Sequence, residues 1–425
     1  MKVNVINIGC FKNLVDCERL MWQIQTVGID VVFGKTDDSC DLVIVNTCGF
    51  ISDAEKDSVS LLQDIARRKR RGQYSRFWVM GCYGQKMGDK IIAKIPEVDR
   101  VYGNFNWNRI VSDLAERPWI DGVNRILTTP RHYAYVKISE GCNMPCSYCI
   151  KPILNGPLKS RPIGEIVEEC KSLVGMGVKE LQIVAQNTTD YGRDLYRQPM
   201  IAELIKHISD IEGVKWIRIH YAYPSNFPKD LLDVITSREN VCNYLDMALQ
   251  HCNEDMLRLM RRPMTKDRLT ALLDEIKACN ISLRTTVMTG HPGETEERFQ
   301  ELKKFVQLRR FDRLGVFPYS HEVRSYSGTH YEDSVPEKVK RDRALELMAI
   351  QREIYNENNN SLIGEKIKVI IDGKTPEGKY IGRPENSTPM ADPKIIISTD
   401  RELKQGEFYE TVVTGNLGKD MEGKI

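Results

Sequence analysis

A chain of 425 residues is too long for a single hydrophobic core, so we expect two or three domains. Hydrophobic residues make up 41% of the chain and charged residues 28%, as in ordinary globular proteins. The formal net charge is only +2, which argues against any function that depends on bulk affinity for nucleic acid.

Nothing in the sequence predicts a membrane partner or export. No apolar run reaches the roughly 18–20 residues that a membrane-spanning helix needs. The first ten residues read as a strand and lack the long apolar segment of a signal peptide. The expected location is therefore the cytoplasm, where twelve cysteines indicate metal or redox chemistry rather than disulfides.

Residues 2 to about 118 alternate short apolar runs with longer amphipathic runs. This βαβ rhythm predicts a doubly wound parallel sheet. We expect strands at Val3–Ile8, Val31–Phe33, Leu42–Asn46 and Phe77–Met80, and helices at Leu14–Gln25 and Ala54–Lys69.

Three cysteines, Cys10, Cys48 and Cys82, fall just past three of these strands. The carboxyl ends of parallel strands share one edge of a sheet, and ligands bind at that edge. Thiols that are 38 and 34 residues apart are therefore expected to meet there and to hold a cluster, with ordinary buried cysteines as the alternative. Cys17, inside a predicted helix, and Cys40, in a polar loop, lack this placement and are expected to be incidental.

The densest positive run, Arg67–Arg71, closes a predicted helix, where the helix dipole favours cations. A solvated helix end is the expected interpretation, and a contact with an acidic partner is the alternative. Farther along, around Pro118–Pro130, the pattern breaks into Arg-Pro-Trp, Asp-Gly and Thr-Thr-Pro, which predicts a linker.

Cys142, Cys146 and Cys149 form a C-x3-C-x2-C pattern within eight residues. Iron–sulfur clusters are held by closely spaced thiolates, normally four for a cubane cluster. Three thiolates leave one iron open to a small molecule. A structural zinc site is an alternative, but zinc usually needs a second ligand pair at some distance. Scattered buried cysteines are another alternative, although buried thiols rarely crowd this tightly.

The central region predicts a partial (β/α)6 barrel with its active face at the carboxyl ends of the strands. The Cys142–Cys149 loop follows the first strand. Expected strands are Tyr133–Ile138, Leu181–Ala185, Trp216–Tyr221, Tyr244–Ala248, Leu283–Met288 and Arg313–Phe317.

Polar residues follow the later strands on the same face. Gln186 and Asn187 follow the second strand, and Gln250 follows the fourth. Gly290 and Gly293 follow the fifth strand and could let a ligand approach the backbone. The alternative for these glycines is a plain tight turn. Four histidines invite catalytic roles, but structural roles are expected more often for such residues. They are His220, His251, His291 and His321.

The last part of the chain begins with a charged helix, Val339–Asn356, that bridges to a terminal module. From about Ser361 short β runs separated by Gly and Pro predict a small β-barrel. Residues 361–425 carry ten Lys/Arg and eleven Asp/Glu, a net charge of −1, whereas an RNA-binding module should be basic.

Together, the two sets of three cysteines and the terminal barrel resemble the radical S-adenosylmethionine (SAM) methylthiotransferases. The resemblance covers nearly the whole chain and implies an N-terminal methylthiotransferase domain at 1–120, a radical-SAM barrel at 131–358 and a TRAM-like β-barrel at 361–425. Several stretches are similar to the ribosomal branch of this family. They are Ile138–Cys142, Ala185–Thr189 with Tyr191–Gly192 and Asp194–Leu195, His220–Pro224, Arg313–Phe317 and Tyr319–Glu322.

The resemblance implies two 4Fe–4S clusters and SAM. Cys142, Cys146 and Cys149 would hold the cluster that cleaves SAM to a 5′-deoxyadenosyl radical, with Tyr148 beside the adenine. Cys10, Cys48 and Cys82 would hold a second cluster that carries the sulfur to be transferred. SAM contacts would come from Gln186, Asn187, Gln250, Gly290 and Gly293.

The resemblance also implies the substrate, an aspartate of the twelfth small-subunit ribosomal protein, methylthiolated at its β-carbon. It implies a flavodoxin- or ferredoxin-type electron donor and no tRNA partner, and it leaves the sulfur source open. The alternatives are a tRNA adenosine methylthiotransferase and, in another class, an iron–sulfur electron or sulfur carrier without SAM chemistry.

The sequence departs from the family pattern at a few positions outside the six ligating cysteines. Cys17 stands where serine is usual, Lys151-Pro152 replaces Ile-Pro, and Asn187 stands where an acidic residue is common in this branch. The terminal stretch Gly415–Ile425 lacks the expected Asp-Leu-Tyr/Phe-Gly ending.

Overall fold

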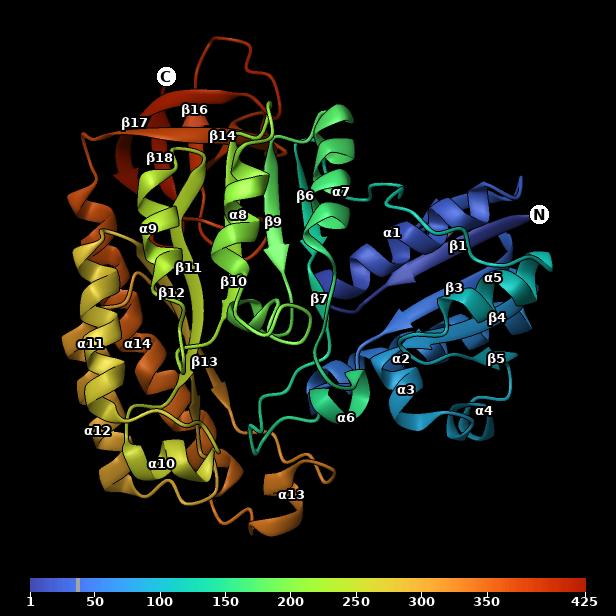
Figure 1. The fold of residues 1–425 in the computed structure, drawn as a ribbon, viewed down its shortest axis with the longest axis horizontal. Coiled ribbons are helices and arrows are strands. Elements are labelled where there is room, and N and C mark those ends of the chain that lie inside the picture. Colours follow the sequence, from blue (N-terminus) through green and yellow to red (C-terminus); the bar gives the residue numbers. More distant parts are fainter. Residues whose placement is uncertain (36–38) are drawn as a thin grey trace. The chain divides into compact units, whose positions relative to one another are not determined.

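The computed structural model describes residues 1–35 and 39–425 (Figure 1). The chain divides into two compact units, and the polypeptide passes between them several times. Unit one contains Met1–Thr129, Tyr135–Ser172 and Ser320–Thr329, and unit two contains Pro130–Ala134, Leu173–Tyr319 and His330–Ile425. In the described part of the chain, no helix is both long enough and apolar enough to cross a membrane.

Unit one is built on a five-stranded parallel sheet with the order β2-β1-β3-β4-β5. The strands are β1 (Lys2–Asn7), β2 (Asp30–Phe33), β3 (Cys40–Thr47), β4 (Tyr74–Gly81) and β5 (Arg100–Val101). The helices between and after them are α1 (Phe11–Gln25), α2 (Ser52–Arg70), α3 (Cys82–Met87), α4 (Lys90–Lys94) and α5 (Trp107–Ala115).

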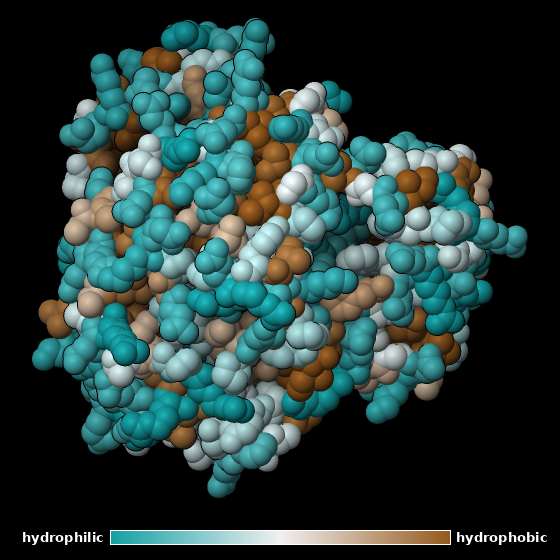
Figure 2. Space-filling view, viewed as in Figure 1, coloured by the Kyte–Doolittle hydropathy of each residue, from teal (hydrophilic) through white to brown (hydrophobic). Residues whose placement is uncertain are grey.

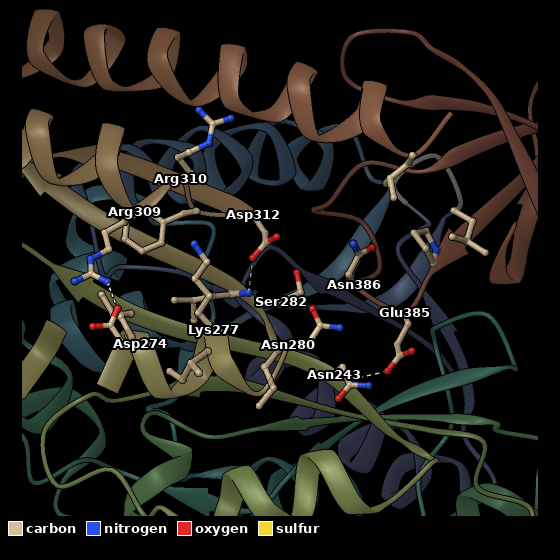
Figure 3. Close-up of a pocket in the computed structure, with 18 of the residues that line it drawn as sticks. Asn243, Asp274, Lys277, Asn280, Ser282, Arg309, Arg310, Asp312, Glu385 and Asn386 are labelled. Atoms are coloured by element: carbon tan, nitrogen blue, oxygen red, sulfur yellow. Dashed lines mark hydrogen bonds and ion pairs between the residues drawn. The ribbon is translucent and has the colours of Figure 1, made fainter. Parts of the chain in front are cut away.

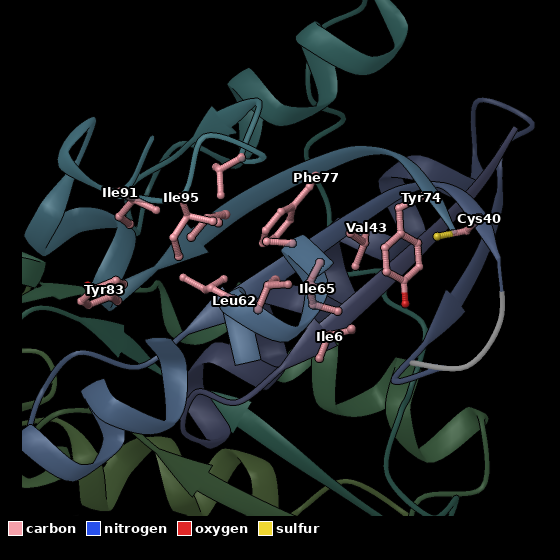
Figure 4. Packing of buried hydrophobic residues seen from close by; sticks show 14 residues of the cluster. Ile6, Cys40, Val43, Leu62, Ile65, Tyr74, Phe77, Tyr83, Ile91 and Ile95 are labelled. Carbon is pink, nitrogen blue, oxygen red and sulfur yellow. The ribbon is translucent and has the colours of Figure 1, made fainter. Parts of the chain in front are cut away.

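Helices cover both faces of this sheet because successive strand residues point to opposite faces. In β3, Val43 and Val45 pack with residues of α2 and α4 in one core, shown in Figure 4. Leu42 and Ile44 pack with residues of α1 and α5 in the other core. The two cores confirm the doubly wound fold that the sequence predicts.

The remaining segments of unit one follow the linker. Strand β6 (Tyr133–Lys137) leads into the cysteine loop, and β7 (Ser139–Glu140) pairs antiparallel with β8 (Lys159–Ser160). Helix α6 (Lys151–Asn155) lies between β7 and β8 in sequence. Helices α7 (Ile163–Gly175) and α13 (Tyr326–His330) also belong in part to unit one. Strand β6 and helices α7 and α13 each cross a boundary between the two units.

Unit two contains most of a second parallel sheet, whose six strands have the order β13-β12-β11-β10-β9-β6. Its own strands are β9 (Glu180–Val184), β10 (Trp216–Ala222), β11 (Val241–Gln250), β12 (Ser282–Thr289) and β13 (Arg313–Pro318). Its helices are η1 (Thr188–Asp190), α8 (Ile201–Ser209), α9 (Asp230–Ser237), α10 (Glu254–Leu259), α11 (Lys266–Ala278), α12 (Glu296–Arg309) and α14 (Glu337–Ser361).

The chain ends in a closed barrel with the strand order β14-β15-β16-β18-β17. These strands are β14 (Lys366–Lys374), β15 (Tyr380–Pro384), β16 (Ile395–Ser398), β17 (Phe408–Asn416) and β18 (Met421–Lys424). Strand β18 falls in the atypical terminal stretch and pairs with both β16 and β17, so that stretch closes the barrel. The parallel sheet, the partial βα barrel and this β-barrel confirm the predicted fold class.

A buried ionic network joins the β-barrel to the parallel sheet within unit two. Glu180, the first residue of β9, accepts hydrogen bonds from Arg218 at 3.0 Å and from Arg383 of β15 at 2.9 Å. Arg383 also donates to Asp372 at 2.9 Å, and a ring nitrogen of His132 lies 2.9 Å from the same carboxylate. Buried charges are tolerated where they are paired in this way.

Two surface features agree with the composition. Hydrophilic residues predominate on the face shown in Figure 2, with hydrophobic residues interspersed. The basic run Arg67–Arg71 ends α2, where Arg68 pairs with Asp64 and Lys69 with Asp99. This basic run is thus a helix end with its own counter-charges, as expected.

One local prediction is wrong. Cys40, expected in a polar loop, is the first residue of β3, where it pairs with Tyr74 and is buried in the core on the α2 face. Its neighbour Asp41 is exposed.

Candidate functional site

The three strand-end cysteines of unit one lie at the carboxyl edge of its sheet. Cys10 occupies the N-cap position of α1, three residues after β1. Cys48 directly follows β3, and Cys82 directly follows β4 as the first residue of α3. Helix N-termini favour negative charge, so two of the three sites suit a thiolate.

Glycines beside these cysteines bring the loops close together. A Cβ on Gly81, whose φ is +93°, would lie 2.6 Å from the carbonyl oxygen of Thr47. A Cβ on Gly49 would lie 2.9 Å from the Cα of Tyr83. The loops after β3 and β4 therefore touch through backbone, which holds Cys48 and Cys82 near each other.

The thiols of this first set act on each other electrostatically. Burial, followed by the charges of Cys10 and Cys48, raises the pKa of Cys82 to about 11. Burial also raises the pKa of Cys48, and Cys10 adds to the effect. For Cys10 burial is again the largest influence, but Lys12, Lys151 and backbone amides outweigh it and lower the pKa. Three mutually repelling thiolates are a donor set that a cationic iron centre would stabilise.

The second set of cysteines lies in the loop between β7 and α6 of the same unit. The backbone N–H of Met144 lies 3.4 Å from Sγ of Cys142, and that of Lys151 lies 3.4 Å from Sγ of Cys149. Burial raises the pKa of Cys149 to about 12, with the charges of Cys146 and Cys142 adding to it. N–H groups that point at sulfur are typical of the surroundings of iron–sulfur clusters.

Among the described residues, neither cysteine set forms a site for a single metal ion. Within residues 1–35 and 39–425, no three His, Cys, Asp or Glu side chains are gathered closely enough to bind one metal ion. A cubane cluster makes a different demand, because each thiolate binds its own iron and the thiols stand farther apart than around one zinc ion.

Three of the other cysteines have buried, structural surroundings. All twelve cysteines lie in the described ranges, and no disulfide links any of them there. Cys17 is fully buried and its sulfur lies 3.1 Å from the side-chain nitrogen of Asn46, while burial raises its pKa. Cys170 and Cys242 are likewise buried with raised pKa values.

In unit two, the residues expected to contact SAM follow strands of one parallel sheet. Gln186 and Asn187 come after β9, and each has a buried side-chain atom, Oε1 and Nδ2 respectively, that finds no hydrogen-bond partner among the described residues. The other side-chain atom of Asn187 accepts hydrogen bonds from Thr189. Orphaned buried polar atoms at the carboxyl edge suit a polar ligand.

The remaining expected contacts have more local explanations. Gln250 ends β11 with a positive φ of +70°. Gly290 donates its N–H to the carboxylate of Glu294, and the carbonyl of Gly293 accepts from Arg298 at 2.6 Å. The two glycines thus serve the tight turn, and their contact with SAM stays a prediction, as does that of Tyr148.

Three of the four histidines are buried in structural positions. Nε2 of His220 lies 2.6 Å from Oε1 of Gln182, and burial lowers the pKa of His220. His291 donates to the carbonyl of Pro292, and burial lowers its pKa to about 4. Nε2 of His251 lies 3.6 Å from Glu294. His321, in contrast, is exposed.

A pocket of about 720 Å³ in unit two lies away from the expected active face (Figure 3). It is lined by residues at the amino ends of the strands, among them Asn243, Ser282 and Asp312. The backbone N–H of Asn243 donates a hydrogen bond to the carboxylate of Glu385, which follows β15 (dashed line in Figure 3). Because ligands bind at carboxyl ends in such folds, this pocket is not the candidate active site.

The sequence patterns did not predict a role for two residues near the cysteines, Asn104 and Lys151. The side-chain nitrogen of Asn104 lies 3.7 Å from Sγ of Cys82 and 2.7 Å from the side-chain oxygen of Asn155. Lys151, noted above only as a departure from a pattern, lies with its Nζ 4.5 Å from the ring centre of Phe50. Only its place beside Cys149 could have pointed to Lys151.

Family models match three parts of the chain. The model of the radical SAM superfamily matches residues 136–306, and that of an uncharacterized protein family, UPF0004, matches residues 2–103. The TRAM domain model matches residues 363–425.

Among solved structures, the chain is similar in fold to the radical S-adenosylmethionine methyltransferase TsrM from Kitasatospora setae, with a TM-score of 0.60 at 14% identity over 77% of each chain. It is also similar to the cobalamin-dependent radical enzyme OxsB, with a TM-score of 0.54 at 12% identity over 76% of this chain and 54% of that one. At these identities the likeness concerns the fold alone.

Similarity to curated proteins runs the full length of the chain. The ribosomal protein uS12 methylthiotransferase RimO of Parabacteroides distasonis is 46% identical over 427 residues, which cover 100% of this chain and 99% of the relative. The protein of the same name from Porphyromonas gingivalis is 47% identical over 429 residues, with 100% and 99% covered. The chain is therefore a radical-SAM methylthiotransferase and belongs to the RimO family.

Proposed function

We propose that this enzyme inserts a methylthio group at the β-carbon of an aspartate in ribosomal protein uS12. The observation that carries the proposal is full-length identity of 46% to relatives named ribosomal protein uS12 methylthiotransferase. The likeness to the ribosomal branch at Tyr319–Glu322 adds support. The carrier alternative is not favoured, because the radical SAM superfamily model matches residues 136–306.

The enzyme uses SAM and two 4Fe–4S clusters. We assign Cys142, Cys146 and Cys149 to one cluster, whose open iron would bind SAM. We assign the strand-end set, Cys10, Cys48 and Cys82, to the other. When bound, these groups supply radical formation and sulfur transfer, which a carbon without a leaving group requires.

The chain's own residues prepare both sites. The N–H groups of Met144 and Lys151 point at two of the sulfurs of the second set and would favour their thiolate form. The orphaned atoms of Gln186 and Asn187 would orient the polar groups of SAM at the carboxyl edge of the unit-two sheet. Gln250, Gly290, Gly293 and Tyr148 are further contacts that we assign to SAM.

The charge of the terminal barrel favours a basic protein over tRNA as substrate. Residues 361–425 carry ten Lys/Arg and eleven Asp/Glu, and like charges across an interface weaken binding to a polyanion. A ribosomal protein is rich in Lys and Arg because it packs on RNA. We therefore expect no tRNA partner. We place the enzyme in the cytoplasm and propose a flavodoxin- or ferredoxin-type protein as its electron donor. The sulfur source is left open.

A competition assay tests the substrate. Anaerobically reconstituted enzyme, dithionite, sulfide and SAM are mixed with uS12, or with its target loop as a peptide, and with unmodified tRNA. We expect a mass increase of one methylthio group on an aspartate of uS12 and an unchanged tRNA digest. Methylthioadenosine in the tRNA with uS12 untouched would overturn the substrate assignment.

Iron content tests the two cluster assignments. The wild-type chain should hold about eight irons, and replacing Cys142, Cys146 and Cys149 together by Ala should leave about four and abolish release of 5′-deoxyadenosine. Replacing the strand-end set should also leave about four irons, with part of the SAM cleavage retained. A triple variant of the second set that still cleaves SAM would contradict the assignment.

A further inference from the structure

Lys151 contacts the loops that carry Cys149 and Cys48, one from each cysteine set of unit one. It is the first residue of α6, and its backbone N–H lies 3.4 Å from Sγ of Cys149. Its Nζ lies 4.5 Å from the ring centre of Phe50, which stands two residues after Cys48. A cation over an aromatic face is held there electrostatically, so the ammonium group is directed toward the strand-end set.

The far end of the same helix is tied to the same edge of the sheet. The side-chain oxygen of Asn155 accepts a hydrogen bond of 2.7 Å from Asn104. The same nitrogen of Asn104 lies 3.7 Å from Sγ of Cys82. Helix α6 therefore contacts Phe50, two residues after Cys48, through its first residue, and contacts Asn104, a neighbour of Cys82, through its last.

Lys151 brings a positive charge to the loops of both sets. Its backbone N–H contacts Sγ of Cys149, and its ammonium group lies over the ring of Phe50, in the loop that carries Cys48. In the parts of the chain that the structure describes, no carboxylate forms an ion pair with Lys151, so its charge is not neutralised locally. The residue is partly buried, which limits screening by solvent.

We propose that Lys151 is a positioning residue shared by the two cluster sites, at which its ammonium group stabilises the reduced state of each cluster. The inference rests on the proposed function, which assigns a cluster to each cysteine set. One-electron reduction adds a negative charge to a cluster, and a nearby fixed cation favours that charge. One lysine would thus raise the reduction potential of both clusters together.

Redox titrations followed by electron paramagnetic resonance test this inference in the absence of SAM and of uS12. The potentials are measured separately, in a chain whose Cys142, Cys146 and Cys149 are replaced by Ala and in one whose Cys10, Cys48 and Cys82 are replaced. In each background Lys151→Met is compared with Lys151→Arg, which keeps the charge. Lys171→Met, an exposed lysine of α7 in the same unit, is the matched control.

We expect Lys151→Met to lower the ratio of reduced to oxidised cluster about tenfold at a given potential, a downward shift of about 59 mV for a one-electron couple, in both backgrounds. Lys151→Arg and Lys171→Met should leave both potentials near those of the parent chains. About four irons in each background with an unchanged potential, or a shift in one background only, would overturn the shared role of Lys151. A background that binds no iron would instead overturn the proposed two-cluster function and the inference with it.

Discussion

Nζ of Lys86 lies 2.6 Å from a carboxylate oxygen of Glu322, a residue 236 positions later in the chain, and 2.8 Å from one of Glu55. Glu322 closes the Tyr319–Glu322 stretch that resembles the ribosomal branch. A few residues on, the N–H of Ser327 donates to the carbonyl of Ser147, inside the second cysteine loop, at 2.7 Å. Residues 320–329 therefore connect that loop to helix α3, which begins at the strand-end cysteine Cys82.

Lys86→Met should loosen residues 320–329. Lys86 and Glu322 are both largely buried, so removing the ammonium leaves buried carboxylate oxygens without a partner and should cost about 1–3 kcal/mol. We expect faster proteolysis within residues 320–329 and a lower yield of methylthiolated uS12, with an iron content near that of the wild type. Lys56→Met, which breaks the exposed pair with Asp53, is the control and should change none of the three.

Gly81→Ala should disturb the strand-end cluster site. The new Cβ would lie 2.6 Å from the carbonyl oxygen of Thr47, at a φ of +93° that L-residues rarely adopt, and the strain should be of order 1–3 kcal/mol. We expect the iron content to fall from about eight toward about four per chain, because Cys82 is displaced.

Gly72→Ala is the matched control for this change. Gly72 also has a positive φ, +80°, but a Cβ there would meet nothing within 4 Å. It should lose some stability from its backbone conformation and keep its full complement of iron. Equal iron losses in the two variants would mean that the contact with Thr47 does not position Cys82.

The strand-end cysteines could be foreseen because a parallel sheet brings the carboxyl ends of its strands together whatever their separation in sequence. The roles of Glu322 and Lys151 could not, because they depend on tertiary contacts that local patterns do not encode. The strand at Leu42–Asn46 was predicted, but the polar residues before it concealed that β3 begins at Cys40, which pairs with Tyr74 of β4. The three domain boundaries and the SAM contacts stay predictions.

Glu180→Gln should be strongly destabilising. Arg218 and Arg383 are fully buried, and both donate to Glu180, so its neutralisation leaves Arg218 without a counter-charge and Arg383 with Asp372 alone. The expected loss is about 3–5 kcal/mol, measured as the free energy of unfolding in denaturant. The same change at Glu203, whose pair with Lys206 is exposed, should cost less than about 1 kcal/mol. Similar losses at both positions would contradict the role of the buried network.

Asp372 should make the stability of unit two sensitive to acid. Burial acts to raise the pKa of Asp372, but hydrogen bonds from His132 and Arg383, together with their charges, outweigh it and lower the pKa to about 2. A carboxyl group whose pKa is lower in the folded than in the unfolded state contributes stability above its unfolded pKa, near 3.9, and loses that contribution as the pH falls through its folded value.

We therefore expect the stability of unit two to decline between about pH 4 and pH 2, with Asp372 accounting for up to about 2.5 kcal/mol of the decline. Asp372→Asn should remove this part of the pH dependence while lowering stability at pH 7, because Asn cannot balance the buried charge of Arg383. Asp210→Asn, at an exposed pair with Arg238, is the control and should follow the wild-type profile. The measurement is the free energy of unfolding against pH, and a profile for Asp372→Asn that parallels the wild type from pH 7 to pH 2 would show that Asp372 is not the acid-sensitive group.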